Sequence, residues 1–528
     1  MAPRVLLTSV FKPFGVDNIY GRKESRIELY HNQITKYQDV FSLRAFFNSF
    51  GLHVIANNIE VPTTVLDFPT LPQFVRELKQ GYDFVGISGI QCNFQKIKKM
   101  VETAREVAPQ STLVLGGFCT TLPGLRDMLD VDHVCVGEGV GFMRALLGLP
   151  PEFHYKNPDM YSAAREVMGA PIRGVKYPYI AVGLGCPYGC DFCSPSHFFG
   201  RRHIKYYKSG RDLFTELMRV KKRFRTPVST LIGDDNFLLD RERAEELRQC
   251  VIESGEMFNI SLFGSADKVA EFGPERLAEM GVNIIWIGRE GKFSAYAKNQ
   301  NANLKSLVAE LKTVGIKTIL SSILLLEQHT KENIIEDIDD HIACEPAFSQ
   351  FAHYSPAPGT PLYERLEAEG RVLDGIPLEE WHAFKQPWFS HPQFTLVEAE
   401  RVQEKAYTRD FLELGPSLLR YIATDCMAWR RLKDSDKPHL RKRADAIAGQ
   451  MWKNKCVVKA IALLAPTTHI RELAQETLAA IQKEFGGINP AQYAVAQGLH
   501  LSGRIRRLRT ALWGDNMQPP TQRIKYNY

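Results

Sequence analysis

The sequence predicts an α/β protein in which two units of parallel sheet and covering helices precede a mostly helical region. Short apolar runs alternate with segments of helical period through roughly the first 370 residues, and this alternation stops near residue 411. Most of the apolar runs end in glycine, as expected where parallel strands meet the ligand-binding edge of a sheet. We predict domains over 1–150, 176–410 and 411–528, with a linker over 151–175.

Composition agrees with a soluble globular protein and indicates its setting. The 528 residues are 44% hydrophobic and 24% charged, and no apolar run is long enough to predict a transmembrane helix. The first residues do not resemble a signal peptide. Seven of the ten cysteines are scattered, which is not the pattern of a disulfide scaffold. We therefore expect a cytoplasmic, reducing location.

The first 150 residues alternate between strand and helix patterns. Strands are predicted over 4–10, 52–59, 83–90, 111–117 and 133–139, and helices over 42–51, 70–81 and 93–109. Candidate ligand-binding residues at the strand ends are Ser88, Gly116, Gly117, Gly137 and Glu138, since glycine lets a ligand approach the backbone. The alternative is that these glycines only form the turns after the strands and bind no ligand. No GxGxxG follows the first strand, which argues against a dinucleotide fold of the usual kind.

Three cysteines lie within eight positions of the second unit, in "GLGCPYGCDFCSPS". A structural zinc site needs a second CxxC pair and a ferredoxin cluster needs a fourth cysteine, whereas a redox motif leaves one cysteine unexplained. The remaining interpretation is a [4Fe-4S] cube held at three corners by Cys186, Cys190 and Cys193, with one iron open to a substrate or cofactor. Gly185 and Gly189 give the loop the backbone freedom that such wrapping requires.

CxxxCxxC with an aromatic residue, Phe192, before its last cysteine resembles the signature of the radical S-adenosylmethionine (SAM) enzymes. It follows a predicted strand over 177–185. The resemblance implies that Cys186, Cys190 and Cys193 hold a [4Fe-4S] cluster whose open iron chelates the amino and carboxylate groups of SAM. Electron transfer then cleaves SAM to methionine and a 5′-deoxyadenosyl radical.

Later segments resemble further strands of that family in the same order. "STLIGDDNFLLD" resembles the second-strand element, with Gly233, Asp234 and Asp235 where GGE is usual. "GVNIIWIGREGKF" resembles the strand that contributes a contact to the SAM ribose, with Glu290 retained and Gly291 in place of serine. "GIKTILSSILLL" and "FSQFAHYSPAPGTPLYERLEAEG" resemble the strands that close the barrel. The resemblance implies a partial (β/α)6 TIM-like barrel, with SAM contacts from Phe192, Gly233, Asp234, Asp235 and Glu290.

The N-terminal unit resembles the domain that precedes the barrel in the cobalamin-dependent subgroup of this family. "DFVGISGI", "STLVLGGFCTTLP" and "VDHVCVGEGVGFMRALL" resemble its cobalamin-binding strands. The resemblance implies a Rossmann-like, flavodoxin-like fold that surrounds cobalamin with Ser88, Gly116, Gly117, Gly137 and Glu138. The DxHxxG motif is absent, so we expect no histidine ligand on the lower face of cobalt. A relic domain that binds no cobalamin is the alternative.

The last fifth of the chain carries the basic excess. Residues 421–528 hold eighteen Lys and Arg against eight Asp and Glu, a net charge of +10 in a chain whose total is +6. "SGRIRRLRTALWGD" is basic and amphipathic, with Ile505, Leu508, Leu512 and Trp513 facing one way. A solvated helical cap over the barrel is one interpretation, and peripheral contact with an anionic membrane surface is the other. Nucleic acid is not an expected partner, since no nucleic-acid-binding module accompanies the charge.

The resemblance implies a cobalamin-dependent radical SAM methyltransferase that acts on an unactivated carbon of a small-molecule or lipid substrate. A low-potential electron donor of flavodoxin or ferredoxin type is the implied partner. Two alternatives stay open: ring or carbon–carbon bond formation with the same cofactors, and a non-catalytic iron–sulfur or cobalamin-binding protein. The sequence names no catalytic residue, substrate or oligomeric state. Candidates for the substrate cavity are His203, Tyr206, Tyr207 and Tyr354.

Overall fold

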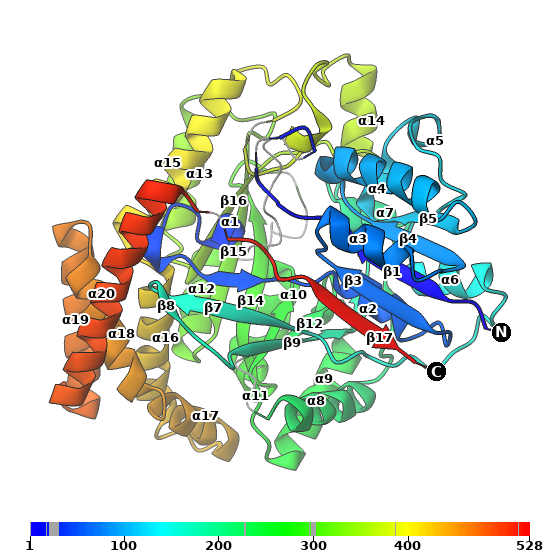
Figure 1. Ribbon diagram of the computed structural model, residues 1–528. Helices are drawn as coiled ribbons and strands as arrows, with labels where there is room; N and C mark the ends of the chain where they lie inside the picture. Colours follow the sequence, from blue (N-terminus) through cyan, green and yellow to red (C-terminus); the bar gives the residue numbers. More distant parts are fainter. Residues whose placement is uncertain are drawn as a thin grey trace.

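The computed structural model describes residues 2–16, 18–20, 31–225, 229–294, 296, 303–385, 387–515 and 517–527. Figure 1 shows two sheets side by side, with helices over their faces and a stack of helices from the last part of the chain beside the second sheet. The predicted α/β class with a mostly helical C-terminal region is confirmed. Among the described residues, no helix is both long and apolar enough to cross a membrane.

The first sheet has six strands in the order β17-β3-β1-β4-β5-β6. Its parallel members are β1 (Val5–Ser9), β3 (Thr63–Asp67), β4 (Phe84–Ser88), β5 (Thr112–Gly116) and β6 (His133–Val134). The connecting helices include α2 (Phe50–Ala56), α3 (Leu71–Leu78), α4 (Phe94–Val107) and α6 (Gly139–Leu146). Every residue of β1 and β3 is buried, as expected for a parallel sheet covered on both faces. Apart from β17, the strand order is that of flavodoxin-like folds, with the topological switch point between β1 and β4.

Two predicted elements near the start of the chain are wrong. The segment 42–51, predicted as a helix, contains the strand β2 (Arg44–Phe46), and 52–59, predicted as a strand, lies largely in α2. One of the two strands beside β1 is β3, in a segment for which the sequence predicts no strand. Strand β2 forms because it pairs with β7 of the second sheet. Local periodicity carries no information about such long-range pairing.

The second sheet has nine strands and curls into part of a barrel, in the order β16-β15-β14-β13-β12-β9-β7-β2, with β8 beside β7. Six strands are parallel: β9 (Lys176–Ala181), β12 (Thr230–Gly233), β13 (Ile260–Phe263), β14 (Val282–Glu290), β15 (Lys317–Leu324) and β16 (Phe348–His353). The helices that follow them include α8 (Gly210–Phe224), α9 (Arg241–Ser254), α10 (Ala266–Phe272), α11 (Pro274–Glu279), α12 (Leu304–Thr313), α13 (Asn333–Ile342) and α14 (Pro361–Ala368). These units confirm the predicted partial (β/α)6 barrel.

Segments outside the six units extend both sheets. The predicted linker includes β7 (Tyr161–Val167) and β8 (Ala170–Pro171), and β7 pairs antiparallel with β9. The C-terminal helices are α15 (Leu396–Leu414), α16 (Ser417–Leu432), α17 (Pro438–Ala448), α18 (Met451–Leu464), α19 (Thr468–Phe485) and α20 (Pro490–Trp513). Strand β17 (Gln522–Tyr526), red in Figure 1, then pairs antiparallel with β3 of the first sheet. The end of the chain thus returns to its beginning, and the predicted domain boundaries stay predictions.

Candidate functional site

The three cysteines lie on one loop at the carboxyl end of the barrel, between β10 (Gly183–Leu184) and the short helix α7 (Ser194–Phe198). Cys186, Cys190 and Cys193 are half-buried, and none of the ten cysteines forms a disulfide. In the described part of the chain, no three His, Cys, Asp or Glu side chains converge as ligands of one metal ion. Three thiolates on one loop fit an iron–sulfur cluster, which binds each sulfur to a different iron rather than to one shared ion.

Glycine and serine set the course of this loop. Gly185 and Gly189 have left-handed φ angles of 78° and 68°, and a Cβ added at Gly185 would lie 2.3 Å from the carbonyl oxygen of Arg202. The Ser196 hydroxyl accepts a hydrogen bond from the Gly189 N–H at 3.2 Å and donates one to the Cys186 carbonyl oxygen at 2.6 Å. Main-chain geometry therefore determines where the three cysteines sit.

Asp191, inside the cysteine motif, ties the loop to the far side of the barrel. Its carboxylate accepts hydrogen bonds from Tyr296 at 2.6 Å and from Tyr354, after β16, at 3.0 Å. Phe192 packs edge-on against Tyr296 with 5.1 Å between ring centroids. Burial raises the pKa of both phenols, and the bond to Asp191 raises that of Tyr296 further, so both remain donors at neutral pH. Phe192 thus belongs to an aromatic cluster beside the loop.

The turn after β12 places its first two residues against protein. A side chain at Gly233 has no room, because a Cβ would lie 2.1 Å from the Tyr179 hydroxyl oxygen. Asp234 is buried, with Oδ2 3.0 Å from His203 Nε2 and 2.8 Å from Arg243 Nη2. Burial acts to raise the pKa of Asp234, but the hydrogen bond from His203 and the charge of Arg243 lower it below its usual range. Asp234 therefore forms a buried ion pair.

The third residue of this turn, Asp235, lies toward the cysteine loop. It is exposed, and its carboxylate accepts a hydrogen bond from the Gly185 N–H at 2.5 Å. Partial burial of the carboxylate by the surrounding protein and the charge of the adjacent Asp234 raise the pKa of Asp235. Of the two adjacent carboxylates, Asp235 is the one that contacts the cysteine loop.

Glu290 ends β14 in a strained conformation. Its φ of 64° is in the left-handed region, and only 5% of the residue is exposed. Such strain costs about 1–3 kcal/mol and concentrates at functional sites. The next residue is Gly291, where the resembled strand has serine. The structure explains this difference, because a Cβ at Gly291 would lie 2.8 Å from Asp337 Oδ2. That carboxylate already binds Arg289 and His329, so it has little freedom to move.

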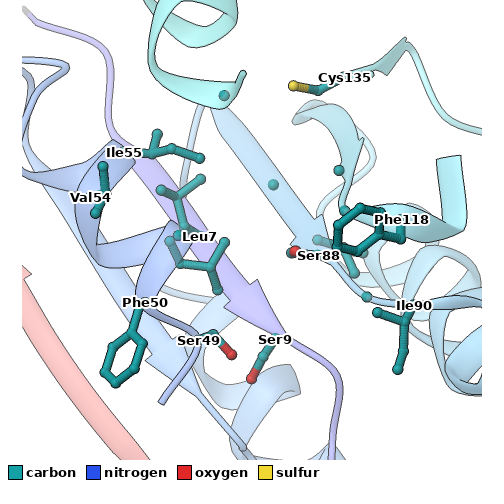
Figure 2. Close-up of a pocket in the computed structure, with 18 of the residues that line it drawn as sticks. Leu7, Ser9, Ser49, Phe50, Val54, Ile55, Ser88, Ile90, Phe118 and Cys135 are labelled. Atoms are coloured by element: carbon teal, nitrogen blue, oxygen red, sulfur yellow. The ribbon is translucent and has the colours of Figure 1, made fainter. Parts of the chain in front are cut away.

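A cavity of about 550 Å³ lies between the carboxyl end of the first sheet and the β9–α7 side of the barrel. All five residues predicted to surround cobalamin line it: Ser88, Gly116, Gly117, Gly137 and Glu138. The barrel contributes Tyr179, Ala181, Leu184, Phe198, Phe199 and Tyr206. Figure 2 shows Leu7, Phe50 and Ile55 on one side of this cavity and Ser88 and Phe118 on the other. The cavity lies at the topological switch point, where doubly wound sheets bind their ligands.

Glycine is required where the loops after β4 and β5 meet. Gly117 has a φ of 86°, and a Cβ there would lie 2.4 Å from the Gly89 carbonyl oxygen and 3.0 Å from the Ser88 hydroxyl oxygen. Bare backbone beside largely apolar walls fits a broad cofactor such as a corrin. Among the described residues that line the cavity there is no histidine. The predicted lack of a lower-face ligand stays a prediction.

Glu138 links the first sheet to the barrel. Its carboxylate caps α6 by accepting hydrogen bonds from the N–H groups of Val140 at 2.8 Å and Gly141 at 2.7 Å. The same carboxylate accepts a hydrogen bond of 2.6 Å from Tyr206, which follows β11 (Ile204–Lys205). Burial and the charge of Glu138 raise the pKa of this phenol. Glu138 therefore fixes the position of the turn that borders the cavity.

No model of a protein family matches this chain. Comparison with curated proteins finds relatives that align with it over part of their length. An uncharacterized methyltransferase of Pyrococcus horikoshii is 22% identical over 45% of this chain and 52% of that protein. Bacteriochlorophyllide d C-8(2)-methyltransferase of Chlorobaculum tepidum is 21% identical over 57% of this chain and 71% of its own. Anaerobic magnesium-protoporphyrin IX monomethyl ester cyclase of Cereibacter sphaeroides is 23% identical over 60% and 58%. The chain thus spans about half to seven tenths of these relatives.

Solved structures of one radical SAM methyltransferase, TsrM of Kitasatospora setae, share the fold. The form with cobalamin and a [4Fe-4S] cluster aligns with a TM-score of 0.52 at 13% identity, over 92% of this chain and 99% of that one. The form with tryptophan and a SAM analogue has the same TM-score at 14% identity, over 82% and 90%. The chain therefore shares its fold with a cobalamin-binding radical SAM enzyme and is similar in sequence to methyltransferases and a cyclase.

In this radical SAM fold, the four candidate substrate residues lie in different places. Tyr206 lines the cavity. Tyr354 binds Asp191 inside the cysteine loop, His203 binds Asp234 after β12, and Tyr207 packs against the barrel core. Of these four, Tyr206 alone lines the cavity between the sheets.

Several residues that shape this candidate site escape prediction from sequence. Asp191 carries a signal, since it lies inside the cysteine motif, but its tyrosine partners are more than 100 positions away. Arg243 and Asp337 lie on helices and carry none, because only the fold brings them to the strand ends. Phe198 and Phe199 line the cavity and lie a few positions after Cys193, and this closeness in sequence to the cysteines is the signal that could have found them.

Proposed function

We propose that this chain is a cobalamin-dependent radical SAM enzyme that methylates an unactivated carbon. The observation that carries the proposal is the position of α7. The helix that follows the three cysteines supplies Phe198 to the cavity lined by the strand ends of the first sheet. This link between the cysteine loop and the cavity supports placing the cluster and cobalamin near one another. The bound cluster supplies the electron that cleaves SAM, and cobalamin supplies the methyl group.

Within this proposal, the chain's residues have distinct tasks. The cluster ligands are Cys186, Cys190 and Cys193. Phe192, Gly233, Asp235 and Glu290 form the SAM side, and Asp234 positions that turn through its ion pair with Arg243. Ser88, Gly116, Gly117 and Gly137 form the backbone edge for cobalamin, and Glu138 holds their turn in place.

The reacting part of the proposed substrate is apolar. Phe47, Phe50 and Tyr179 line both the large cavity and a second one, of about 90 Å³, inside the barrel. The inner cavity is lined largely by apolar side chains, among them Phe263 and Trp286. Burial of a hydrocarbon there is favourable by about 25 cal/mol per Å² of apolar surface. A carbon of such a group offers no electron pair to a polar methyl donor, which is why radical chemistry suits it.

Anaerobic reconstitution tests the proposal. The chain is loaded with iron, sulfide and cobalamin, reduced by a flavodoxin or ferredoxin, which we propose as its electron donor, and given SAM with a deuterated methyl group plus a host lipid and metabolite extract. Mass spectrometry should show 5′-deoxyadenosine, S-adenosylhomocysteine and a product carrying the deuterated methyl. If the protein fails to cleave SAM even with a strong chemical reductant, the proposal that it is an enzyme is contradicted, and a non-catalytic cofactor-binding protein is favoured.

Ring or carbon–carbon bond formation is the second candidate function. It is favoured by the similarity to the anaerobic cyclase. The same experiment separates the two, because cyclisation yields 5′-deoxyadenosine without S-adenosylhomocysteine. We place either reaction in the cytoplasm, since ten cysteines without a disulfide suit a reducing compartment. Peripheral membrane contact is argued separately below.

A further inference from the structure

Helix α20 presents an apolar stripe to solvent. Leu501, Ile505, Leu508 and Leu512 recur at intervals of four, three and four residues, and they are 60%, 51%, 60% and 60% exposed. This spacing places the four side chains on one face of the helix. The opposite face packs on α18. Figure 1 shows α20 at the edge of the molecule, beside α19 and α18. The helix therefore has one apolar side covered by protein and another that is open.

Positive charges border the open stripe. Arg504 and Arg509 are exposed, and within the described part of the chain neither forms an ion pair. The other two arginines of the helix, Arg506 and Arg507, pair with acidic residues of the protein. No Asp or Glu occurs between residues 490 and 513. The open face thus combines apolar side chains with uncompensated positive charge.

The apolar stripe and its bordering arginines indicate what kind of partner can cover this face of α20. A second copy bound through the same stripe would bring Arg504 and Arg509 toward their counterparts, with no acidic residue on the helix to offset the repulsion. Anionic headgroups pair with arginine while the acyl boundary accepts leucine. Trp513, 66% exposed at the end of the helix, has the amphipathic ring that suits a membrane interface. We propose that α20 lies in the plane of an anionic membrane surface, independently of the reaction at the barrel.

Co-sedimentation of the full-length protein with vesicles tests this proposal. One set contains phosphatidylcholine alone and the other adds phosphatidylglycerol. We expect binding to the mixed vesicles that salt weakens. Leu501→Gln with Leu508→Gln should lower that binding at least about tenfold. Arg504→Gln with Arg509→Gln should lower it about fivefold for each arginine and reduce its salt dependence.

A matched pair of changes controls for surface polarity. Val397 and Met427 are 58% and 47% exposed on other helices, so Val397→Gln with Met427→Gln should leave vesicle binding unchanged. Absence of binding by the wild type, or equal binding by the wild type and the double leucine variant, overturns the proposal. So does a wild-type dimer in analytical ultracentrifugation that the leucine changes dissociate, since the stripe would then bind a second copy.

Discussion

The two aspartates of the GDD turn have opposite surroundings, and Asp234→Asn tests that difference. Asp234 and Arg243 are both 0% exposed at their side chains, and Oδ2 lies 2.8 Å from Nη2. An amide oxygen at position 234 can still accept a hydrogen bond, as the carbonyl oxygens of Tyr207 and Phe237 do, but none of these acceptors offsets the positive charge of the buried guanidinium. Removing one partner of a buried pair costs about 3–5 kcal/mol. We expect a loss of that size in the free energy of unfolding.

Asp235→Asn is the matched control for this change. The Asp235 side chain is exposed, and an amide oxygen can still accept the hydrogen bond from the Gly185 N–H. We therefore expect a loss of stability of about 1 kcal/mol or less, together with weaker SAM binding. Urea unfolding of the full-length chain, followed by circular dichroism, measures both stabilities, and equilibrium dialysis of labelled SAM against the reconstituted protein measures binding.

The pH dependence gives the Asp234 assignment a second check. His203 and Arg243 hold the pKa of Asp234 below its usual range against the opposing effect of burial. The stabilisation is therefore present above the pKa of the unfolded state and is lost as pH falls through the lower folded value. The stability gap between wild type and Asp234→Asn should be full at neutral pH and shrink in acid. Equal stability of the two proteins at neutral pH, or a gap that persists in strong acid, refutes the reasoning.

Three further predictions follow from other parts of the molecule. Cys190→Ala should abolish cluster absorbance and SAM cleavage; retained cleavage in an anaerobic assay would reject the cluster assignment. Gly117→Ala puts a Cβ 2.4 Å from backbone and should abolish cobalamin retention on gel filtration, whereas Gly148→Ala, at a left-handed glycine with open space around it, should not. Asp425→Asn removes the negative charge that pairs with the buried Lys317 at the start of β15, so thermal unfolding should show a loss of about 3–5 kcal/mol.

The fold was predictable where local pattern and packing agree. The apolar runs of β1, β4 and β5 are buried strands, and the helix predicted over 93–109 is α4 because its apolar residues share a buried face. The prediction fails over 42–59, where Arg44–Phe46 pairs with a strand more than 100 residues away. The return of β17 to the first sheet is likewise a long-range pairing. No window of sequence contains the partner in either case, so periodicity cannot report it.

The same distinction separates what the sequence reveals about the site from what it conceals. Glycine requirements are local: the left-handed turns at Gly185 and Gly189 follow from the loop that the cysteine spacing imposes. Whether a charged side chain is buried, paired or exposed does not depend on local sequence. "GDD" presents two identical carboxylates, and only α9, by bringing Arg243 to the end of β12, turns Asp234 into a buried ion pair and leaves Asp235 toward the cysteine loop. Because desolvation and pairing decide the ionisation and accessibility of each carboxylate, chemically equal neighbours acquire different roles only once the chain has folded.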